Sequence, residues 1–358
     1  MCWRRLPSGP VTLAAGGTRV EIDDAGEGPG AAVVGDLPPN SRLSLDVAWL
    51  GGKKRLRFKT LPSPPGELLY RFATVNDIHI GDRAFGMYRG MAEPPGTEPP
   101  FPWRCATAAL QEAVEWGAES IVVKGDLTRA GRPREWASVG RLLASQPIPV
   151  DIILGNHDVQ RTAPDARPLL AEHGIKVPIE PFFRDVPGLR LVFGHTAAQG
   201  ARKGAIDEAQ RRAVAELCAA ADGPAFVALH HYLQRFRMTT MWPPGVPGPQ
   251  ADAFLDAIEA ANPATIVATG HSHRHRRHSR HAIVTAEIGS TKDYPGTWAG
   301  YAVHEGGIRQ VVRRVARPDA MAWTERTRRA MFGIWGYWSP GLRTHRCFTH
   351  VWPTRGER

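Results

Sequence analysis

The chain has 358 residues, enough for one large domain or two unequal ones, since a single domain usually holds about 100 to 200 residues. Apolar residues make up 42% of the chain and charged residues 22%, a balance that excludes a disordered or fibrous protein. No stretch approaches the roughly 18 consecutive apolar residues that a membrane helix needs, so we expect no membrane span.

Positive charge is concentrated at the C-terminal end. The chain has 45 Lys and Arg against 35 Asp and Glu, a net charge of +10, and residues 309–358 alone contain 11 Arg, no Lys and three acidic residues. This segment also carries Trp323, Trp335, Trp338 and Trp352. One interpretation is that its aromatic residues pack against the main body or a second subunit while its arginines stay solvated. The other is a patch that contacts nucleic acid, because aromatic and Arg side chains stack on bases.

The cysteines and the N-terminus indicate a cellular location. Cys2, Cys105, Cys218 and Cys347 are far apart and match no paired spacing of a zinc or redox site, so we expect free thiols in a reducing compartment. The sequence PSGP at positions 7–10 interrupts the place where a secretory apolar region would begin. We therefore predict a cytoplasmic protein without a signal peptide.

Residues 1–66 predict a small all-β domain. Short alternating apolar runs are separated by Gly, Pro, Asn and Asp, which is typical of strands joined by turns. The sequence SPPG at 63–66 has the composition of a linker. We expect a second domain at 67–312 and the basic tail at 313–358.

Between residues 67 and 312, apolar β-rich runs alternate with segments of helical periodicity. We predict strands at Leu68–Val75, Ser120–Val123, Val150–Leu154, Leu189–Phe193, Ala225–Leu229 and Thr265–Ala268. Apolar residues recur every three or four positions in the predicted helices Arg104–Trp116, Arg134–Ala144, Glu208–Ala221 and Asp252–Ala261. This alternation indicates a layered α/β domain.

Polar residues follow five of these predicted strands, at the carboxyl ends where α/β sheets gather ligands. The five clusters are Asp77-Ile78-His79, Gly125-Asp126, Gly155-Asn156-His157-Asp158, His230-His231 and Gly270-His271-Ser272-His273. On an extended chain, a spacing of two puts both side chains of Asp-x-His or His-x-His on one side of the backbone. Each pair can then address one metal site.

The donor types in these clusters suit Fe, Mn, Zn, Co or Ni, and the absence of Cys argues against a structural zinc site. Seven such ligands are too many for one ion, whereas two ions about 3.5 to 4 Å apart that share a carboxylate would use them all. Paired cations hold a phosphoryl group while a hydroxide between them attacks in line, which predicts phosphoester hydrolysis. His157, oriented by the neighbouring carboxylate of Asp158, fits the role of proton donor to the leaving group.

The ordered series of clusters resembles the calcineurin-like metallophosphoesterase superfamily, whose pattern is Asp-x-His, Gly-Asp-x-x, Gly-Asn-His-Asp/Glu, His and Gly-His-x-His. The resemblance covers about residues 70–290 and is closest to the bacterial cyclic-nucleotide phosphodiesterase and purple acid phosphatase-like branches. It implies two metal ions, with Fe, Mn or Zn expected. The implied ligands of the first ion are Asp77, His79 and His273, and those of the second are Asn156, His230 and His271. Asp126 would bridge the two, and His157 would contact the scissile phosphate.

The resemblance also implies a fold: two facing β-sheets flanked by helices, a four-layer αββα sandwich. We expect the apolar stretches Ala282–Ile288 and Trp298–Val303 to extend the second sheet. The pattern of residues 33–66 resembles the small fibronectin-like β-sandwich that precedes the catalytic domain of purple acid phosphatases. In the cyclic-nucleotide branch the sequence Gly-Asp-Leu-Thr commonly continues with Asp, and this chain has Arg129 there.

Three hypotheses for function follow. The first is a dinuclear-metal phosphoesterase that acts on a small phosphodiester or phosphomonoester, with a cyclic nucleotide among the candidate substrates. The second is a nuclease of the same superfamily that binds DNA or RNA through the basic tail. The third is a non-catalytic binding protein on this fold. The physiological substrate, the metal identity and the oligomeric state stay open.

Overall fold

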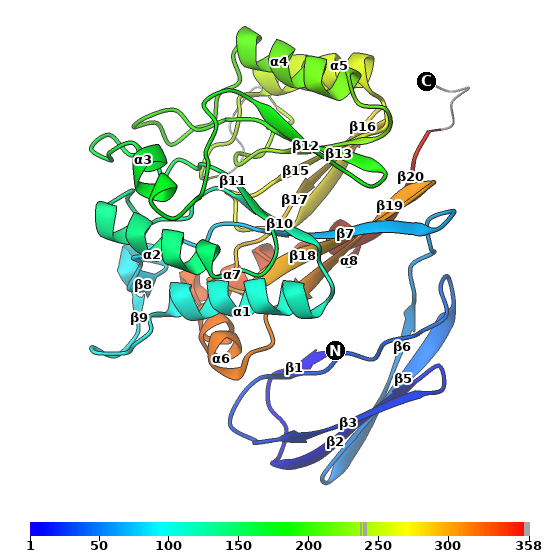
Figure 1. Ribbon diagram of the computed structural model, residues 1–358. Coiled ribbons are helices and arrows are strands. Elements are labelled where there is room, and N and C mark those ends of the chain that lie inside the picture. Colours follow the sequence, from blue (N-terminus) through cyan, green and yellow to red (C-terminus); the bar gives the residue numbers. More distant parts are fainter. Residues whose placement is uncertain (237, 239–241, 354–358) are drawn as a thin grey trace.

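The computed structural model describes residues 1–236, 238 and 242–353. Its main body contains two six-stranded sheets that face each other (Figure 1). The strand order of the first sheet is β11 (Val150–Ile153), β10 (Ser120–Lys124), β7 (Leu68–Val75), β18 (Thr297–His304), β19 (Gly307–Arg314) and β20 (Cys347–Val351). The strand order of the second sheet is β12 (Phe182–Val186), β13 (Leu189–Phe193), β14 (Ala225–Ala228), β15 (Thr265–Thr269), β17 (Ile283–Glu287) and β16 (Arg276–Arg280).

Helices cover the outer face of each sheet. The first sheet is covered by α1 (Phe101–Glu115), α2 (Pro133–Ala144), α3 (Ala166–Ala171) and α6 (Pro318–Thr327). The second sheet is covered by α4 (Glu208–Ala219) and α5 (Gly248–Ala261). The short elements are β8 (Ala84–Phe85), η1 (Met87–Arg89), β9 (Met91–Ala92), η2 (Met331–Gly333), α7 (Trp335–Trp338) and α8 (Arg343–Arg346). No helix in the described part of the chain is long and apolar enough to cross a membrane.

Alternation along the strands explains why four layers form. In β7, Phe72 belongs to the core between the sheets, and its neighbour Ala73 belongs to the core under α1 and α2. In β14, Phe226 points into the same inter-sheet core, and Val227 packs under α4 and α5. Successive side chains of a strand point to opposite faces, so strands that are apolar throughout need cover on both sides. The predicted αββα sandwich is confirmed.

The predicted strands and helices are present, with shifted ends. Helices α1 and α5 begin three and four residues before the predicted starts, at Phe101 and Gly248. Both begin with Pro at the first or second helical position, where the missing N–H removes no helical hydrogen bond. Apolar periodicity does not reveal these first turns.

The prediction for the last two strands is only half correct. Strand β17 lies in the second sheet as expected, whereas β18 lies in the first sheet, where it pairs antiparallel with β7. Tyr301 of β18 stacks on Phe72 with ring centroids 4.7 Å apart. Because β18 is buried on both faces, its sequence carries no signal of the sheet that it joins.

The N-terminal region forms a four-stranded antiparallel sheet in the order β3 (Thr18–Asp24), β2 (Gly9–Ala15), β5 (Arg42–Trp49) and β6 (Gly52–Lys59). Gly16 and Gly17 have positive φ in the two-residue turn between β2 and β3, as a hairpin of this length favours. Strands β1 (Cys2–Trp3) and β4 (Gly30–Ala31) form a separate antiparallel pair. Trp3 of β1 packs with residues of β2 and β5 in a small hydrophobic core. The fibronectin-like assignment stays a prediction.

The C-terminal residues are part of the main body. Strand β19 crosses the predicted boundary at residue 312, and β20 pairs with it as the edge strand of the first sheet. Trp323 of α6 is buried and stacks on Phe101 of α1 with centroids 4.0 Å apart. Glu325 forms ion pairs with Arg314 and Arg328 at 2.9 and 3.2 Å. Trp323 and Trp352 of this segment therefore pack against the domain, as in the first interpretation of the tail, whereas Phe332 and Tyr337 are exposed.

Candidate metal centre

The seven predicted ligands come together at one edge of the two sheets. Strands β7, β10 and β11 of the first sheet lead into the loops that carry Asp77, His79, Asp126 and Asn156. Strands β14 and β15 of the second sheet lead into the loops that carry His230, His271 and His273. Six of the seven side chains form overlapping groups whose potential ligand atoms lie within 4.8 Å of one another. Asn156 joins them through its contact with His230, 3.2 Å between Asn156 Oδ1 and Nε2.

Five of these residues have a left-handed backbone. The φ angles of Asp77, His79, Asp126, His271 and His273 lie between 51° and 68°, a region that non-glycine residues seldom occupy. The prediction of an extended backbone for Asp77-x-His79 and for His271-x-His273 is therefore wrong. Strained conformations of this kind cost about 1–3 kcal/mol each and cluster at functional sites.

One half of the cluster contains Asp77, His79 and His273. Nε2 of His273 lies 3.6 Å from Oδ1 of Asp77, and Nε2 of His79 lies 3.5 Å from Oδ2 of Asp126. Neither ring nitrogen of the buried His79 has a hydrogen-bond partner. A buried polar atom without a partner is costly, and a metal ion at this position would supply one.

The other half contains Asn156, His230 and His271 around the second oxygen of Asp126. Nε2 of His230 lies 3.2 Å from Nδ1 of His271 and 3.4 Å from Oδ1 of Asp126. His230 Nδ1 donates to the Lys124 carbonyl at 2.8 Å, and His271 Nε2 donates to the Pro244 carbonyl at 3.2 Å. In the neutral rings, the lone pairs of His230 Nε2 and His271 Nδ1 therefore face each other and the carboxylate of Asp126. Such a set of donors fits a cation between them.

Of the four proposed histidine ligands, His79 and His271 have lowered pKa values, whereas the pKa values of His230 and His273 are raised by neighbouring carboxylates. Burial, together with Lys292 for His79 and with His231 for His271, holds the pKa of both imidazoles well below the usual value. They are therefore neutral, the form that binds metal. Burial alone would lower the pKa of His230, but Asp126 raises it to about 9. His230 thus faces a carboxylate that attracts a positive charge, either a proton or a metal ion.

Further residues hold the ligands in place, and sequence analysis missed them. Asp293 accepts a hydrogen bond from His273 Nδ1 at 2.6 Å and another from Trp335 Nε1 at 3.0 Å. Asn76 donates to Asp77 Oδ2 at 2.5 Å. Such partners orient metal ligands. Asp293 follows β17 by six residues, so its position after a strand was a signal, although it belongs to none of the five motifs.

His157 is oriented by a backbone carbonyl, and this corrects the expectation for Asp158. Nδ1 of His157 lies 2.8 Å from the carbonyl oxygen of Arg129, so the carbonyl fixes Nδ1 as the protonated nitrogen and leaves Nε2 for the cavity. The Asp158 carboxylate instead accepts from the N–H groups of Leu127, Thr128 and Gly155 at 2.8 to 3.1 Å and from the Thr128 hydroxyl at 2.7 Å. Its role is to join the loops after β10 and β11.

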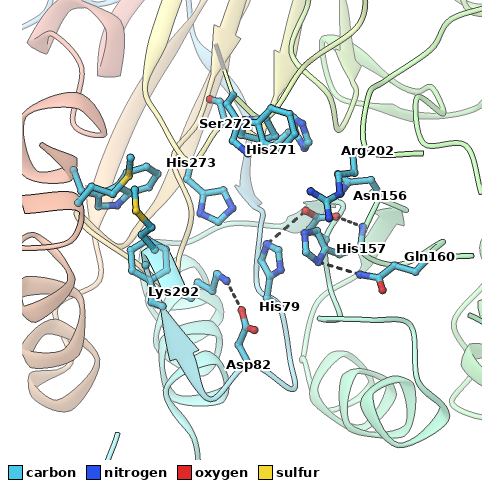
Figure 2. A pocket seen from close by; sticks show the side chains of 18 of the residues that line it. His79, Asp82, Asn156, His157, Gln160, Arg202, His271, Ser272, His273 and Lys292 are labelled. Carbon is cyan, nitrogen blue, oxygen red and sulfur yellow. Dashed lines mark hydrogen bonds and ion pairs between the residues drawn. The ribbon is translucent and has the colours of Figure 1, made fainter. Parts of the chain in front are cut away.

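A cavity of about 1000 Å³ opens over the cluster (Figure 2). His79, His157 and His273 line it, together with the cationic side chains of Arg161, Arg202 and Lys292. Lys292 Nζ lies 2.5 Å from Asp82 Oδ2, and Arg129 Nε lies 3.3 Å from Asp82 Oδ1. His231 offers a further potential ligand atom within 4.8 Å of those of His230 and His271, and its Nδ1 lies 2.9 Å from the Thr196 hydroxyl.

Comparison with known proteins settles the family. The calcineurin-like phosphoesterase family matches residues 70–275, more than half of the chain. The chain belongs to the calcineurin-like phosphoesterase family. The match includes all seven predicted ligands and His157. No curated protein gives a match.

Solved structures share the fold at low sequence identity. A purple acid phosphatase from yellow lupin (Lupinus luteus) seeds is 13% identical with a TM-score of 0.50, over 88% of this chain and 69% of that one. GAP50, the anchor in the inner membrane complex of Plasmodium, is 11% identical with a TM-score of 0.48, over 70% and 86%. Phosphopantetheinyl hydrolase from Mycobacterium tuberculosis is 16% identical with a TM-score of 0.39, over 62% and 90%. The lupin structure supports the fold of this chain.

The role of Asp158 predicts a large loss of stability when its side chain is removed. Asp158→Ala leaves four buried donors without their acceptor, and each such group costs about 1–3 kcal/mol. We expect urea denaturation to show that the free energy of unfolding falls by at least about 3 kcal/mol. Asp185→Ala, which removes an exposed ion pair with Arg190, should change it by no more than about 1 kcal/mol. Equal effects of the two substitutions would contradict the assigned role.

Proposed function

We propose that this protein is a dinuclear-metal phosphoesterase that hydrolyses a phosphodiester or phosphomonoester. The observation that carries the proposal is the position of Asp126, whose two carboxylate oxygens each face a different histidine, His79 and His230. A phosphoesterase needs paired cations over one reacting phosphate. The family membership supports the same reaction type.

The proposed metal ligands form two sets of three residues that share Asp126. Asp77, His79 and His273 would hold one ion, Asn156, His230 and His271 the other, and Asp126 both. Fe, Mn and Zn suit these carboxylate, carboxamide and imidazole donors. The two ions, when bound, would polarise the phosphoryl oxygens and supply a hydroxide nucleophile.

Residues around the ligands would bind the phosphate and move the proton. The cations Arg161 and Arg202 line the cavity, so they would attract a phosphate, while the charge of Lys292 is offset by its ion pair with Asp82. When both nitrogens of the His157 ring carry a proton, Nε2 would donate its proton to the leaving oxygen, while the Arg129 carbonyl keeps the proton on Nδ1. The carbonyl takes the positioning role that the sequence assigned to Asp158.

The bridging role predicts a joint loss of metal and activity in Asp126→Asn. The amide removes one anionic oxygen from the bridge, so we expect metal content to fall and turnover of bis-p-nitrophenyl phosphate with manganese to drop on the order of 10³-fold or more. Metal analysis and the same assay should find Asp185→Asn unchanged, since Asp185 lies on the surface of β12. Full turnover in Asp126→Asn would contradict the bridge.

The proton-donor role predicts a dependence on the leaving group in His157→Ala. We expect the variant to keep its metal ions and to lose on the order of 10²–10⁴-fold in rate with diphenyl phosphate, whose phenolate leaves poorly without a proton. The loss with bis-p-nitrophenyl phosphate should be much smaller, because p-nitrophenolate leaves unprotonated. Equal losses with both diesters would show that His157 acts in another way.

A further inference from the structure

The cavity has an apolar wall that phosphate hydrolysis does not require. The wall contains Phe85 of β8, and Ile334, Trp335 and Trp338 from the C-terminal segment. The rings of Phe85 and Trp335 meet edge to face, with centroids 5.5 Å apart. Trp335 also contacts His273, with ring centroids 6.3 Å apart. Apolar surface of the cavity therefore begins directly beside the metal cluster.

Two turns of similar sequence continue this wall outward. They are η1 with Met87 and Tyr88, and η2 with Met331 and Phe332. A Cβ on Gly86 would lie 3.6 Å from the Cβ of Ala330, so the two turns adjoin. We call Met87, Tyr88, Met331, Phe332 and Ile334 the apolar rim. All five side chains are exposed.

The backbone of both turns pushes an aromatic ring into solvent. Tyr88 and Phe332 have φ angles of 52° and 57°, which bulky residues rarely adopt. Their side chains are 96% and 99% exposed. Scattered exposed apolar residues need no explanation, but a contiguous group beside a catalytic cavity marks an interaction surface. The strain and the exposure are difficult to reconcile with a role in folding alone.

The sequence around the rim is cationic as well as apolar. Residues 83–92 contain Arg83, which pairs with Glu98 at 2.8 Å, and Arg89. Residues 326–353 contain five Arg, of which Arg328 pairs with Glu325 at 3.2 Å. Arg89 and Arg329, next to the two turns, are exposed. Aromatic and aliphatic side chains combined with Arg are typical of surfaces that bind at the lipid–water interface, and each nearby cation adds attraction to anionic lipid.

We propose that the apolar rim docks on the surface of an anionic lipid assembly and that the phosphoester cleaved at the metal cluster is an amphiphile drawn from it. The substrate part of this inference rests on the proposed phosphoesterase function. Phosphate would lie at the metal cluster, and the apolar part of the substrate would lie against Phe85, Trp335 and Trp338. Tyr88 and Phe332 would enter the interface and hold the mouth of the cavity on the lipid surface.

Two other occupants fit the rim less well. Nucleic acid is bound by aromatic rings that stack on bases, whereas this rim also contains the aliphatic side chains of Met87, Met331 and Ile334, which cannot stack. A second copy of the chain in a twofold dimer would bring the same patch against itself. The arginines around the rim would then repel one another.

Vesicle binding of the metal-loaded full-length protein tests the docking surface. The probes are vesicles of phosphatidylglycerol and phosphatidylcholine, compared with phosphatidylcholine alone, in a sedimentation assay. We expect binding to the anionic vesicles that weakens with added salt, and a loss of at least about tenfold in the partition coefficient for the double variant Tyr88→Ser, Phe332→Ser. The matched control is Leu50→Ser, which replaces a side chain that is 65% exposed in the turn between β5 and β6, and it should bind as the wild type does.

The substrate part is tested with methyl p-nitrophenyl phosphate and dodecyl p-nitrophenyl phosphate. We expect kcat/KM to be at least about tenfold higher for the dodecyl ester through a lower KM, and we expect the preference to shrink in the double variant. Turnover of soluble bis-p-nitrophenyl phosphate should be the same in both proteins, which shows that the variant is folded. Equal kcat/KM for the two esters would overturn the amphiphilic substrate.

The outcomes separate this inference from the proposed function. Metal-dependent diester hydrolysis without vesicle binding, or with binding that the double variant retains, would overturn the lipid surface and leave the phosphoesterase intact. Vesicle binding that depends on Tyr88 and Phe332, without any metal-dependent turnover, would support the lipid-binding surface and contradict the proposed phosphoesterase function. Binding of a single-stranded oligonucleotide, or dimer formation in sedimentation velocity, that is lost in the double variant would assign the rim to nucleic acid or to a second copy.

Discussion

The carboxylate of Asp126 is the group on which the site depends. Its Oδ1 faces His230 of the second sheet, and its Oδ2 faces His79 of the first. The backbone N–H of His157 donates to Oδ1 at 2.8 Å and fixes the plane of the carboxylate. Burial opposes its negative charge, but His230, His157 and His79 hold the pKa of Asp126 well below its ordinary value. One side chain thus links ligands from both sheets.

The motifs need glycine before the proposed ligands because the ligand side chains lie too close to the loop backbone for a Cβ. A Cβ on Gly125 would stand 2.5 Å from Nδ1 of His230, and a Cβ on Gly270 would stand 2.8 Å from Oδ2 of Asp77. A Cβ on Gly155 would collide with Asp126 itself. Each glycine precedes a proposed ligand and lets a loop of one strand approach a side chain from another. The glycines of the motifs are therefore required by the close packing of the loops, and the polar residues by the proposed chemistry.

Much of the fold and the ligand set could be predicted because the signals are local. Apolar runs mark strands such as β7 and β13, and polar residues directly after strands mark the ligands. Long-range features carry no such signal. Strand β16 contains no apolar residue, and the partners of His273 and His157 are Asp293 and the backbone of Arg129, 20 and 28 residues away. The left-handed backbone at the ligands also could not be predicted from residue type, because Asp and His adopt it more often than most non-glycine residues but still only rarely.

The central claim is that Asp126 bridges two metal ions. The most direct measurement is a crystal structure of the manganese-loaded protein with anomalous difference density at the cluster. The account predicts two peaks about 3.5 to 4 Å apart, one next to His79, Asp77 and His273 and the other next to Asn156, His230 and His271, with Asp126 between them. A single peak, or two peaks that Asp126 does not contact, would contradict it.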